Sequence, residues 1–129
     1  MISTRHPYRL GRREYSLGKN RNYQYVYRKG KSYPSRCMVL IYLPARETRV
    51  GYSVSSKVGN AVVRSRLRRF FREDFRMLRP SLKEGKYVFV ARNQAKDTPH
   101  ETLTADMRGL LKRADLFRRM SGGTDGNEA

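Results

Sequence analysis

The sequence predicts one domain of the α/β (α+β) sandwich class, in which helices pack on a single sheet. Its 129 residues, 38% of them hydrophobic, suffice for one core and not for two. Segments 61–78 and 103–114 repeat apolar residues at intervals of three and four, as amphipathic helices do. Shorter apolar runs between turn residues indicate strands at 37–43, 49–55 and 87–91.

The residues before the central helix predict a short helix followed by a pair of strands. The helix should run over 21–29, with Asn20 as its cap, Gly30 after its end, and Tyr23, Val26 and Tyr27 on one face. The strands at 37–43 and 49–55 are separated by a loop that begins with proline, which favours an antiparallel hairpin. An additional strand near the N-terminus is left open.

The central helix is the best-defined element of the sequence. Asn60 can cap it, and Pro80 ends it. Its apolar stripe consists of Val63, Leu67, Phe70, Phe71, Phe75 and Leu78. After the strand at 87–91, the pattern Thr98-Pro99-His100-Glu101 predicts a capping box at the start of the last helix. The core face of that helix should carry Leu103, Met107, Leu110, Leu111 and Ala114.

These elements place the domain at 17–118, preceded by a basic arm at 1–16 and followed by a disordered tail at 119–129. No stretch of roughly 18 apolar residues could cross a membrane, and the N-terminus does not resemble a signal peptide. Cys37 is the only cysteine, so an internal disulfide is excluded. We therefore expect a cytoplasmic protein.

The charge of the chain points to a polyanionic partner. Twenty-nine lysines and arginines oppose eleven acidic residues, which gives a formal net charge of +18. Such a surplus repels itself in a compact fold. Nucleic acid is the favoured partner, because neutralised phosphates release condensed counterions. An anionic membrane surface is the weaker alternative.

Arginines on the central helix are the most informative feature. Arg64, Arg68, Arg72 and Arg76 recur every four residues, with Arg66, Arg69 and Arg79 beside them. A solvated face with internal ion pairs would need matching acids, yet only Glu73 and Asp74 lie on the same helix. Like charges at this spacing destabilise an isolated helix. The pattern therefore indicates an anionic partner, and guanidinium groups suit phosphate.

The remaining residues indicate a binding protein rather than a self-sufficient enzyme. The spacing of Tyr23 and Tyr27 favours core packing, although stacking on unpaired RNA bases is the alternative. His6 and His100 are isolated, and no paired carboxylates stand near them. The acidic residues Asp97, Asp106 and Asp115 are typical of helix-surface charge rather than of metal ligands, and Cys37 is typical of a small buried side chain.

The loop from Lys57 to Val62, followed by Arg64-Ser65-Arg66 at the start of the central helix, resembles a motif in the protein subunit of bacterial ribonuclease P. The family pattern is a strand, a Lys-x-Gly-x-Ala-Val loop and a helix with Arg-Asn-Arg and further basic residues. It is matched by Lys57, Gly59, Ala61, Val62, Arg64, Arg66, Arg68, Arg69 and Arg72. Ser65 stands where the family usually has asparagine. The resemblance covers roughly 8–118 and extends to Leu17, Asn20, Tyr23, Val26, Tyr27 and Gly30.

The resemblance implies an αβββαβα order similar to the second domain of ribosomal protein S5, with a left-handed βαβ crossover. Handedness rules alone favour a right-handed one. It also implies an accessory subunit of a ribonucleoprotein endoribonuclease that removes the 5′ leader of precursor tRNA. The active site belongs to the RNA subunit, which uses magnesium. The protein is expected to be a monomer, one per RNA.

The same resemblance implies two binding surfaces and no catalytic or metal-binding residue in the protein. The surface for the RNA subunit comprises Lys57, Arg64, Ser65, Arg66, Arg68, Arg69 and Arg72. The cleft for the leader comprises Tyr23, Tyr27, Cys37, Val39 and Ile41, which reverses the preference for a core role at the two tyrosines. The alternatives are a ribosome-associated or RNA-chaperone protein without a role in cleavage, and a stand-alone nuclease, which would need an acid–base constellation that the sequence lacks.

Overall fold

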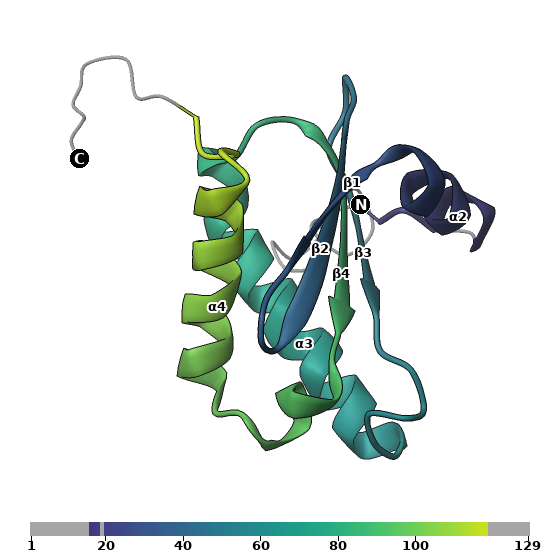
Figure 1. Cartoon of the computed structure of the whole chain (residues 1–129), viewed down its shortest axis with the longest axis vertical. Coiled ribbons are helices and arrows are strands. Elements are labelled where there is room, and N and C mark those ends of the chain that lie inside the picture. The colour runs from purple at the N-terminus through teal and green to yellow at the C-terminus, as the bar shows by residue number, and fades with distance from the viewer. Residues whose placement is uncertain (1–15, 19, 119–129) are drawn as a thin grey trace, which may run out of the picture.

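The computed structural model describes residues 16–18 and 20–118 (Figure 1). The predicted arm therefore lies outside the described residues except for Ser16, and the predicted tail lies outside them entirely. The elements are α2 (Asn20–Lys29), β1 (Lys31–Pro34), β2 (Met38–Pro44), β3 (Arg49–Ser53), α3 (Ala61–Leu78), η1 (Arg79–Ser81), β4 (Gly85–Ala91), η2 (Asn93–Asp97) and α4 (His100–Arg113). This order confirms the αβββαβα expectation, including the additional strand, β1.

The strands form one mixed sheet in the order β1-β2-β4-β3. Strand β2 is antiparallel to β1 and β4, whereas β3 runs parallel to β4. The predicted hairpin of β2 with β3 is wrong, because β4 lies between them. Strand β4 suits that central place, since it is apolar toward both faces of the sheet. The parallel pair needs a long crossover, and α3 supplies it.

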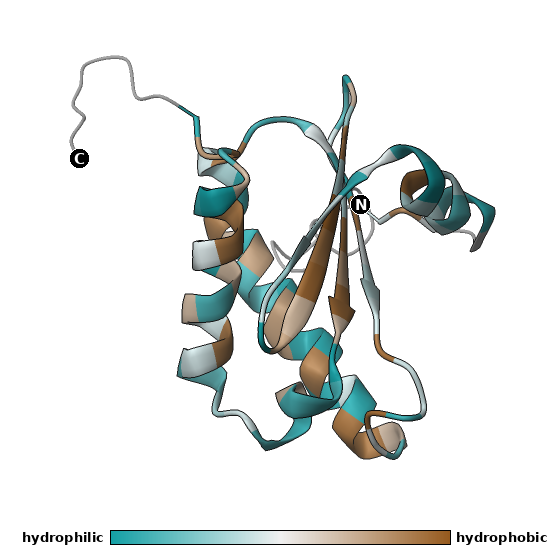
Figure 2. Ribbon diagram, viewed as in Figure 1, coloured by the Kyte–Doolittle hydropathy of each residue, from teal (hydrophilic) through white to brown (hydrophobic). Residues whose placement is uncertain are grey.

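Helices cover the two faces of the sheet unequally. The long helices α3 and α4 lie on one face, and the short helix α2 lies on the other (Figure 1). Tyr87 and Phe89 of β4 point into the main core under α3 and α4, while Val88 between them joins the small cluster under α2. Brown, hydrophobic segments accordingly line both sides of the sheet in Figure 2. In the described residues, no helix is both long and apolar enough for a membrane span.

The helix ends test the capping predictions one by one. Asn60 caps α3 as predicted, because its side-chain oxygen accepts a hydrogen bond from the backbone N–H of Val63 at 3.0 Å. Helix α2 begins at Asn20, the residue predicted as its cap. Gly30 follows α2 because a Cβ there would lie 2.7 Å from the Val26 carbonyl oxygen.

The predicted capping box at the start of α4 is wrong. Pro99 occupies the cap position, and no side chain there bonds to the first turn of the helix. The Thr98 hydroxyl instead donates to the carbonyl of Gln94 at 2.7 Å. That carbonyl comes within reach through η2, a turn of helix that the sequence pattern did not predict.

Candidate nucleic-acid interface

One side of α3 is buried and the other carries arginines. Leu67, Phe71, Phe75 and Leu78 pack into the main core, which confirms the predicted apolar stripe. Arg68 and Arg72 are one turn apart and therefore share a flank of α3, and Arg72 is close enough to Tyr52 of β3 for its charge to act on that side chain. The positive charge of Arg72 accordingly lowers the pKa of Tyr52 in β3, against the larger effect of burial, which raises it. We call Ser65, Arg68, Arg69 and Arg72 the arginine face of α3.

The loop before α3 continues this face. The Arg64 guanidinium donates from Nε to the carbonyl of Gly59 at 3.2 Å, which turns its side chain back over the loop. A Cβ at Gly59 would lie 2.7 Å from Cγ1 of Val63, so this close turn favours glycine. Lys57 is exposed on the same loop. Arg64 therefore extends the arginine face toward the N-terminal end of α3, and Lys57 adds an exposed positive charge on the loop before it.

Arg66 lies on a different side of α3 from Arg64 and Arg68. Two residues along an α-helix are about 200° apart around its axis, so Arg66 points away from both Arg64 and Arg68. Its guanidinium approaches the carbonyl of Lys96 in η2 at 3.5 Å, on the side of α3 that faces α4. The predicted surface for the RNA subunit therefore continues around α3 from Arg72 through Arg69, which is three residues from Arg66, to Arg66 itself.

The sheet face under α2 holds a small apolar cluster. Leu17, Val26, Ile41 and Val88 are buried in it, and Tyr23, Val39, Leu43 and Val90 pack around them. Val39 and Ile41 therefore lie on the predicted side of β2.

Cys37 does not lie on this face, which corrects the predicted cleft. Residues 36–37 form a bend before β2, so the two-residue alternation of the strand does not extend back to Cys37. Its side chain is buried in the main core on the opposite side of the sheet. There its sulfur lies 3.5 Å from the Thr98 hydroxyl.

Tyr23 and Tyr27 have different surroundings although they are one helical turn apart. The ring of Tyr23 is partly buried and lies against Gly51 of β3, where a Cβ would overlap it. Burial raises the pKa of the Tyr23 hydroxyl, and the nearby charge of Arg68 opposes that shift weakly. Tyr27 is 38% exposed, with its ring 6.5 Å from that of Tyr23 in an edge-on arrangement. Tyr23 thus has a packing role, whereas Tyr27 has an accessible ring.

Strand β3 joins the two surfaces. It is an edge strand of the sheet, with Tyr23 of α2 against it on one side and Arg72 of α3 near its Tyr52 on the other. Tyr23 and Arg68 are also close enough for the charge of Arg68 to act on the tyrosine. The arginine face and the face under α2 therefore meet along one edge of the molecule.

Sequence reasoning missed a polar contact between α3 and α4. Asp74 is buried, and one of its carboxylate oxygens lies 3.0 Å from both His100 Nε2 and the Thr104 hydroxyl. The His100 ring stacks on Phe70 with centroids 4.0 Å apart. Burial raises the pKa of the Asp74 carboxyl, while its hydrogen bonds to Thr104 and His100 oppose the shift. Asp74 falls at the spacing of the apolar stripe of α3, between Phe71 and Leu78. An acidic residue at such a core position was the signal in the sequence that Asp74 would be buried against a polar partner.

Asp106 also has a different role from the one predicted. Its carboxylate accepts hydrogen bonds from the Ser35 hydroxyl at 2.6 Å and from the Cys37 backbone N–H at 3.1 Å. It therefore holds the turn between β1 and β2 rather than adding charge to the surface of α4. Within residues 16–18 and 20–118, no three His, Cys, Asp or Glu side chains come together as a metal site.

Known proteins match this chain over most of its length. A family model described as Ribonuclease P matches residues 12–115. The ribonuclease P protein component of Exiguobacterium sp. is 39% identical over 110 residues, which cover 84% of this chain and 96% of the relative. That of Clostridium novyi is 44% identical over 107 residues, which cover 78% and 94%.

Solved structures of such proteins share the fold. The RNase P protein of Staphylococcus aureus superposes with a TM-score of 0.76 at 32% identity, covering 81% of this chain and 98% of that protein. The RNase P protein of Thermotoga maritima gives 0.67 at 26% identity, covering 72% and 91%. Sequence and fold agree, and the chain belongs to the family of ribonuclease P protein components, the subunit that partners the ribonuclease P RNA in the endonuclease of tRNA 5′ maturation.

Proposed function

We propose that the arginine face of α3 binds the RNA subunit and that the face under α2 holds the single-stranded 5′ leader of precursor tRNA. The observation that carries this proposal is the meeting of the two surfaces along β3. One protein placed at the junction of catalytic RNA and substrate could contact both through adjacent surfaces. We further propose that the protein is a monomer and that one copy binds each RNA subunit.

On the arginine face, Lys57, Arg64, Ser65, Arg68, Arg69 and Arg72 would contact phosphates. Arginine grips phosphate through two parallel hydrogen bonds, and this favours fixed docking over loose attraction. Arg66 remains in the RNA-binding set, although it lies on a different side of α3 from Arg64 and Arg68 and would reach a different segment of the RNA.

On the face under α2, Tyr27 is the residue that we expect to stack on a leader base. It is an accessible ring beside an apolar floor that includes Val39 and Ile41. Stacking of a base on an aromatic ring does not depend on which base it is. This suits a protein that binds leaders of different sequence. Tyr23 would position this surface by filling the space above Gly51, and Cys37 is no longer part of it.

We also propose that hydrolysis belongs to the RNA subunit, with magnesium as its metal ion. The contribution of this chain is then binding and orientation, which lower the cost of bringing a charged substrate to a charged ribozyme.

The proposal is tested by reconstitution with a bacterial ribonuclease P RNA at low magnesium. The protein should restore cleavage of precursor tRNA under conditions in which the RNA alone is slow. Lys112→Ala, an exposed change on α4 away from both surfaces, should stimulate as well as the natural chain. A folded protein that leaves cleavage unchanged would favour the ribosome-associated or RNA-chaperone alternative.

A further inference from the structure

Helix α2 divides its sheet face into two flanks. Tyr23 and Tyr27 lie on one flank, which is the proposed leader site. Tyr25 is about 200° around the helix from each of them and therefore lies toward the other flank. Tyr25 is 43% exposed, more than Tyr27. The second flank thus has an accessible aromatic ring that the proposed function does not use.

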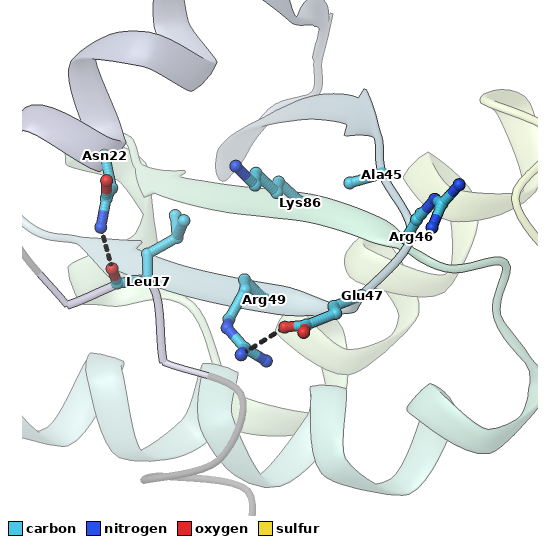
Figure 3. Close-up of a pocket in the computed structure, with 7 residues that line it drawn as sticks. All are labelled: Leu17, Asn22, Ala45, Arg46, Glu47, Arg49 and Lys86. Atoms are coloured by element: carbon cyan, nitrogen blue, oxygen red, sulfur yellow. Dashed lines mark hydrogen bonds and ion pairs between the residues drawn. The ribbon is translucent and has the colours of Figure 1, made fainter.

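A pocket of about 330 Å³ opens on this second flank (Figure 3). It is lined by Leu17, Asn22, Ala45, Arg46, Glu47, Arg49 and Lys86. Figure 3 shows that these residues come from the start of α2, from the loop after β2 and from the strands, with Lys86 directed toward the side of α2, Arg46 directed outward from the loop and Arg49 directed toward Glu47. We call it the Lys86 pocket. Its volume lies at the lower end of the range typical of small-ligand sites.

The sheet register places the basic floor of the Lys86 pocket. Lys86 and Arg49 are register partners in the parallel pair of β4 and β3. Strand alternation puts Lys86 on the same face as Val88, and Arg49 on the same face as Gly51. The face that is apolar under the middle of α2 therefore becomes basic at this end. The side chain of Asn22 closes the pocket, held by a 2.7 Å hydrogen bond to the Leu17 carbonyl.

The charges in the pocket favour an anion. The lining contains three basic side chains and one carboxylate, that of Glu47. The carboxylate forms an ion pair with Arg49. Glu47 therefore orients Arg49 and leaves the lining with an excess of positive charge from Arg46 and Lys86. The N-terminal segment before Ser16 is an unsuitable occupant, because residues 1–15 contain four arginines and one acid.

The rim of the pocket adds a surface for a base. The Lys86 ammonium lies 5.3 Å from the centroid of the Tyr25 ring, and the Arg28 guanidinium lies 6.0 Å from the same centroid. A cation beside an exposed aromatic ring is the combination that binds unpaired nucleotides, through the phosphate and the base respectively. An acidic peptide would use the cations but would have no need of the ring.

We propose that the Lys86 pocket binds one nucleotide of unpaired RNA, with its phosphate between Arg46 and Lys86 and its base on Tyr25. The inference rests on the proposed function, because it adds a second single-strand contact across α2 from Tyr27. The nucleotide can come from a distant part of the leader or from an unpaired segment of the RNA subunit. The chemistry is the same for both sources.

The first test uses the free protein and a labelled single-stranded oligouridylate, with binding followed by fluorescence anisotropy. Tyr25→Ala should weaken binding about tenfold, as expected for the loss of one stacked base. Arg46→Gln and Lys86→Gln should each weaken it and lower the slope of log K against log salt by about 0.7, the value for one phosphate of a single strand. Lys112→Gln, an exposed basic residue on α4, is the matched control and should change neither.

Melting curves come first, because Lys86 lies in a central strand. Arg46 lies in an exposed loop, so Arg46→Gln keeps the test valid if Lys86→Gln does not fold. If folded Arg46→Gln and Tyr25→Ala bind the oligouridylate as the natural chain does, the proposal is overturned. Millimolar inorganic phosphate gives a second check, because it should compete with the oligouridylate for the cations of the pocket. If phosphate competes equally well in the natural protein and in Tyr25→Ala, and Tyr25→Ala binds the oligouridylate normally, the pocket is a simple anion site and the proposal is overturned.

The second test uses the reconstituted holoenzyme to identify the source of the nucleotide. If the leader supplies it, Arg46→Gln should weaken binding of precursor tRNA with a long leader and spare a short one. If the RNA subunit supplies it, the same change should weaken binding of protein to RNA and spare both substrates. If Arg46→Gln weakens neither kind of binding, the inference about the Lys86 pocket is overturned. The proposed function is not affected by that result, because Arg68→Ala and Tyr27→Ala test it separately.

Discussion

The two faces of the sheet differ in how completely they are covered. Under α3 and α4, residues from three strands and both helices form the main core, in which large side chains such as Tyr87, Phe89 and Phe71 are fully buried. Under α2, the buried hydrophobic side chains among the described residues are those of Leu17, Val26, Ile41 and Val88, and the exposed rings of Tyr25 and Tyr27 flank them. Tyr87 and Val88, which are adjacent in the same strand, therefore lie in very different environments.

The difference separates stability from binding. A ten-residue helix cannot cover a four-stranded sheet, so the face under α2 keeps apolar and aromatic surface near solvent. The opposite face is closed, and its outermost layer is the charged side of α3. One face thus offers rings and apolar floor for unpaired bases, while the other offers guanidinium groups for phosphates.

The largest expected effect tests this division through stability. Phe71→Ala in the main core should lower the free energy of unfolding by about 3–5 kcal/mol, because a large buried ring is lost and a cavity remains. Val26→Ala under α2 removes two carbons, and at about 0.8 kcal/mol each it should lower the free energy of unfolding by about 1.6 kcal/mol. Urea unfolding of both variants measures the difference. Equal losses would show that the face under α2 contributes as much to stability as the main core.

The next effect concerns the arginine face. Arg68→Ala and Arg72→Ala should each weaken binding of the RNA subunit and make the slope of log K against log salt shallower by about one unit, because each removes a phosphate contact. Titrations at several salt concentrations measure both quantities, with Lys112→Ala as the control. An unchanged slope in both variants would remove α3 from the interface and leave the closed face without a binding role.

The comparison of the faces also shows what the sequence could predict. Helix α3 was predicted with its correct bounds, because its stripe, its Asn60 cap and Pro80 are all local signals. The side of β2 that Val39 and Ile41 occupy also agreed with the prediction. Strand pairing was not predictable locally, since β4 enters between β2 and β3 from more than thirty residues further along the chain.

The site residues show the same limit. Cys37 was misplaced by a bend of two residues, which alternation in a strand cannot reveal. Arg66 was grouped with Arg64 and Arg68 because all three match the family pattern, although the helical period sends Arg66 to a different side of α3 from those two residues. The contact of Asp74 with His100 joins residues 26 positions apart, and only the packing of α4 on α3 creates it.

Tyr27→Ala tests whether the open face reads the leader. Loss of one stacking ring should weaken binding of precursor tRNA by the holoenzyme by about 1–3 kcal/mol. Binding of mature tRNA, which lacks the leader, should be nearly unchanged. Affinities of the holoenzyme for the two RNAs, with natural protein and with the variant, provide the measurement.

Circular dichroism and melting must show that the Tyr27 variant is folded, because the ring also meets Tyr23. Equal loss for both RNAs, or no loss for either, would mean that Tyr27 does not contact the leader. The face under α2 would then be incompletely covered without being a binding site.

A smaller effect concerns the polar contact inside the closed face. Burial raises the pKa of Asp74 in the folded protein above its ordinary value of 3.8, so the folded state holds this proton to higher pH than the unfolded state does. Stability from this group is therefore greatest at low pH and falls as pH rises through the window between the two pKa values. The Asp74→Asn variant has no titrating group at this position. The part of the pH dependence of stability that comes from Asp74 should therefore be absent from this variant.

Melting temperatures of the natural protein and of Asp74→Asn, measured across that window, give the comparison. The natural protein should gain stability relative to the variant as pH falls. The opposite trend would mean that the hydrogen bonds from Thr104 and His100 outweigh burial at Asp74, and that the closed face tolerates a buried charge.

The smallest effect is expected at Ser65, in the middle of the arginine face. Ser65 is exposed on α3, so asparagine, the residue usual in the family at this position, can replace it without disturbing the core. Stability should stay within about 0.5 kcal/mol. Ser65→Asn adds an amide that can both donate and accept hydrogen bonds, and it leaves the neighbouring guanidinium groups in place. Affinity for the RNA subunit should therefore equal or exceed that of the natural protein, with an unchanged salt slope because no charge is altered. A marked loss of affinity in a folded variant would mean that the RNA approaches so closely at Ser65 that a longer side chain is excluded. The contacts assigned to Arg68 and Arg72 from the family pattern would then have to be measured anew for this chain.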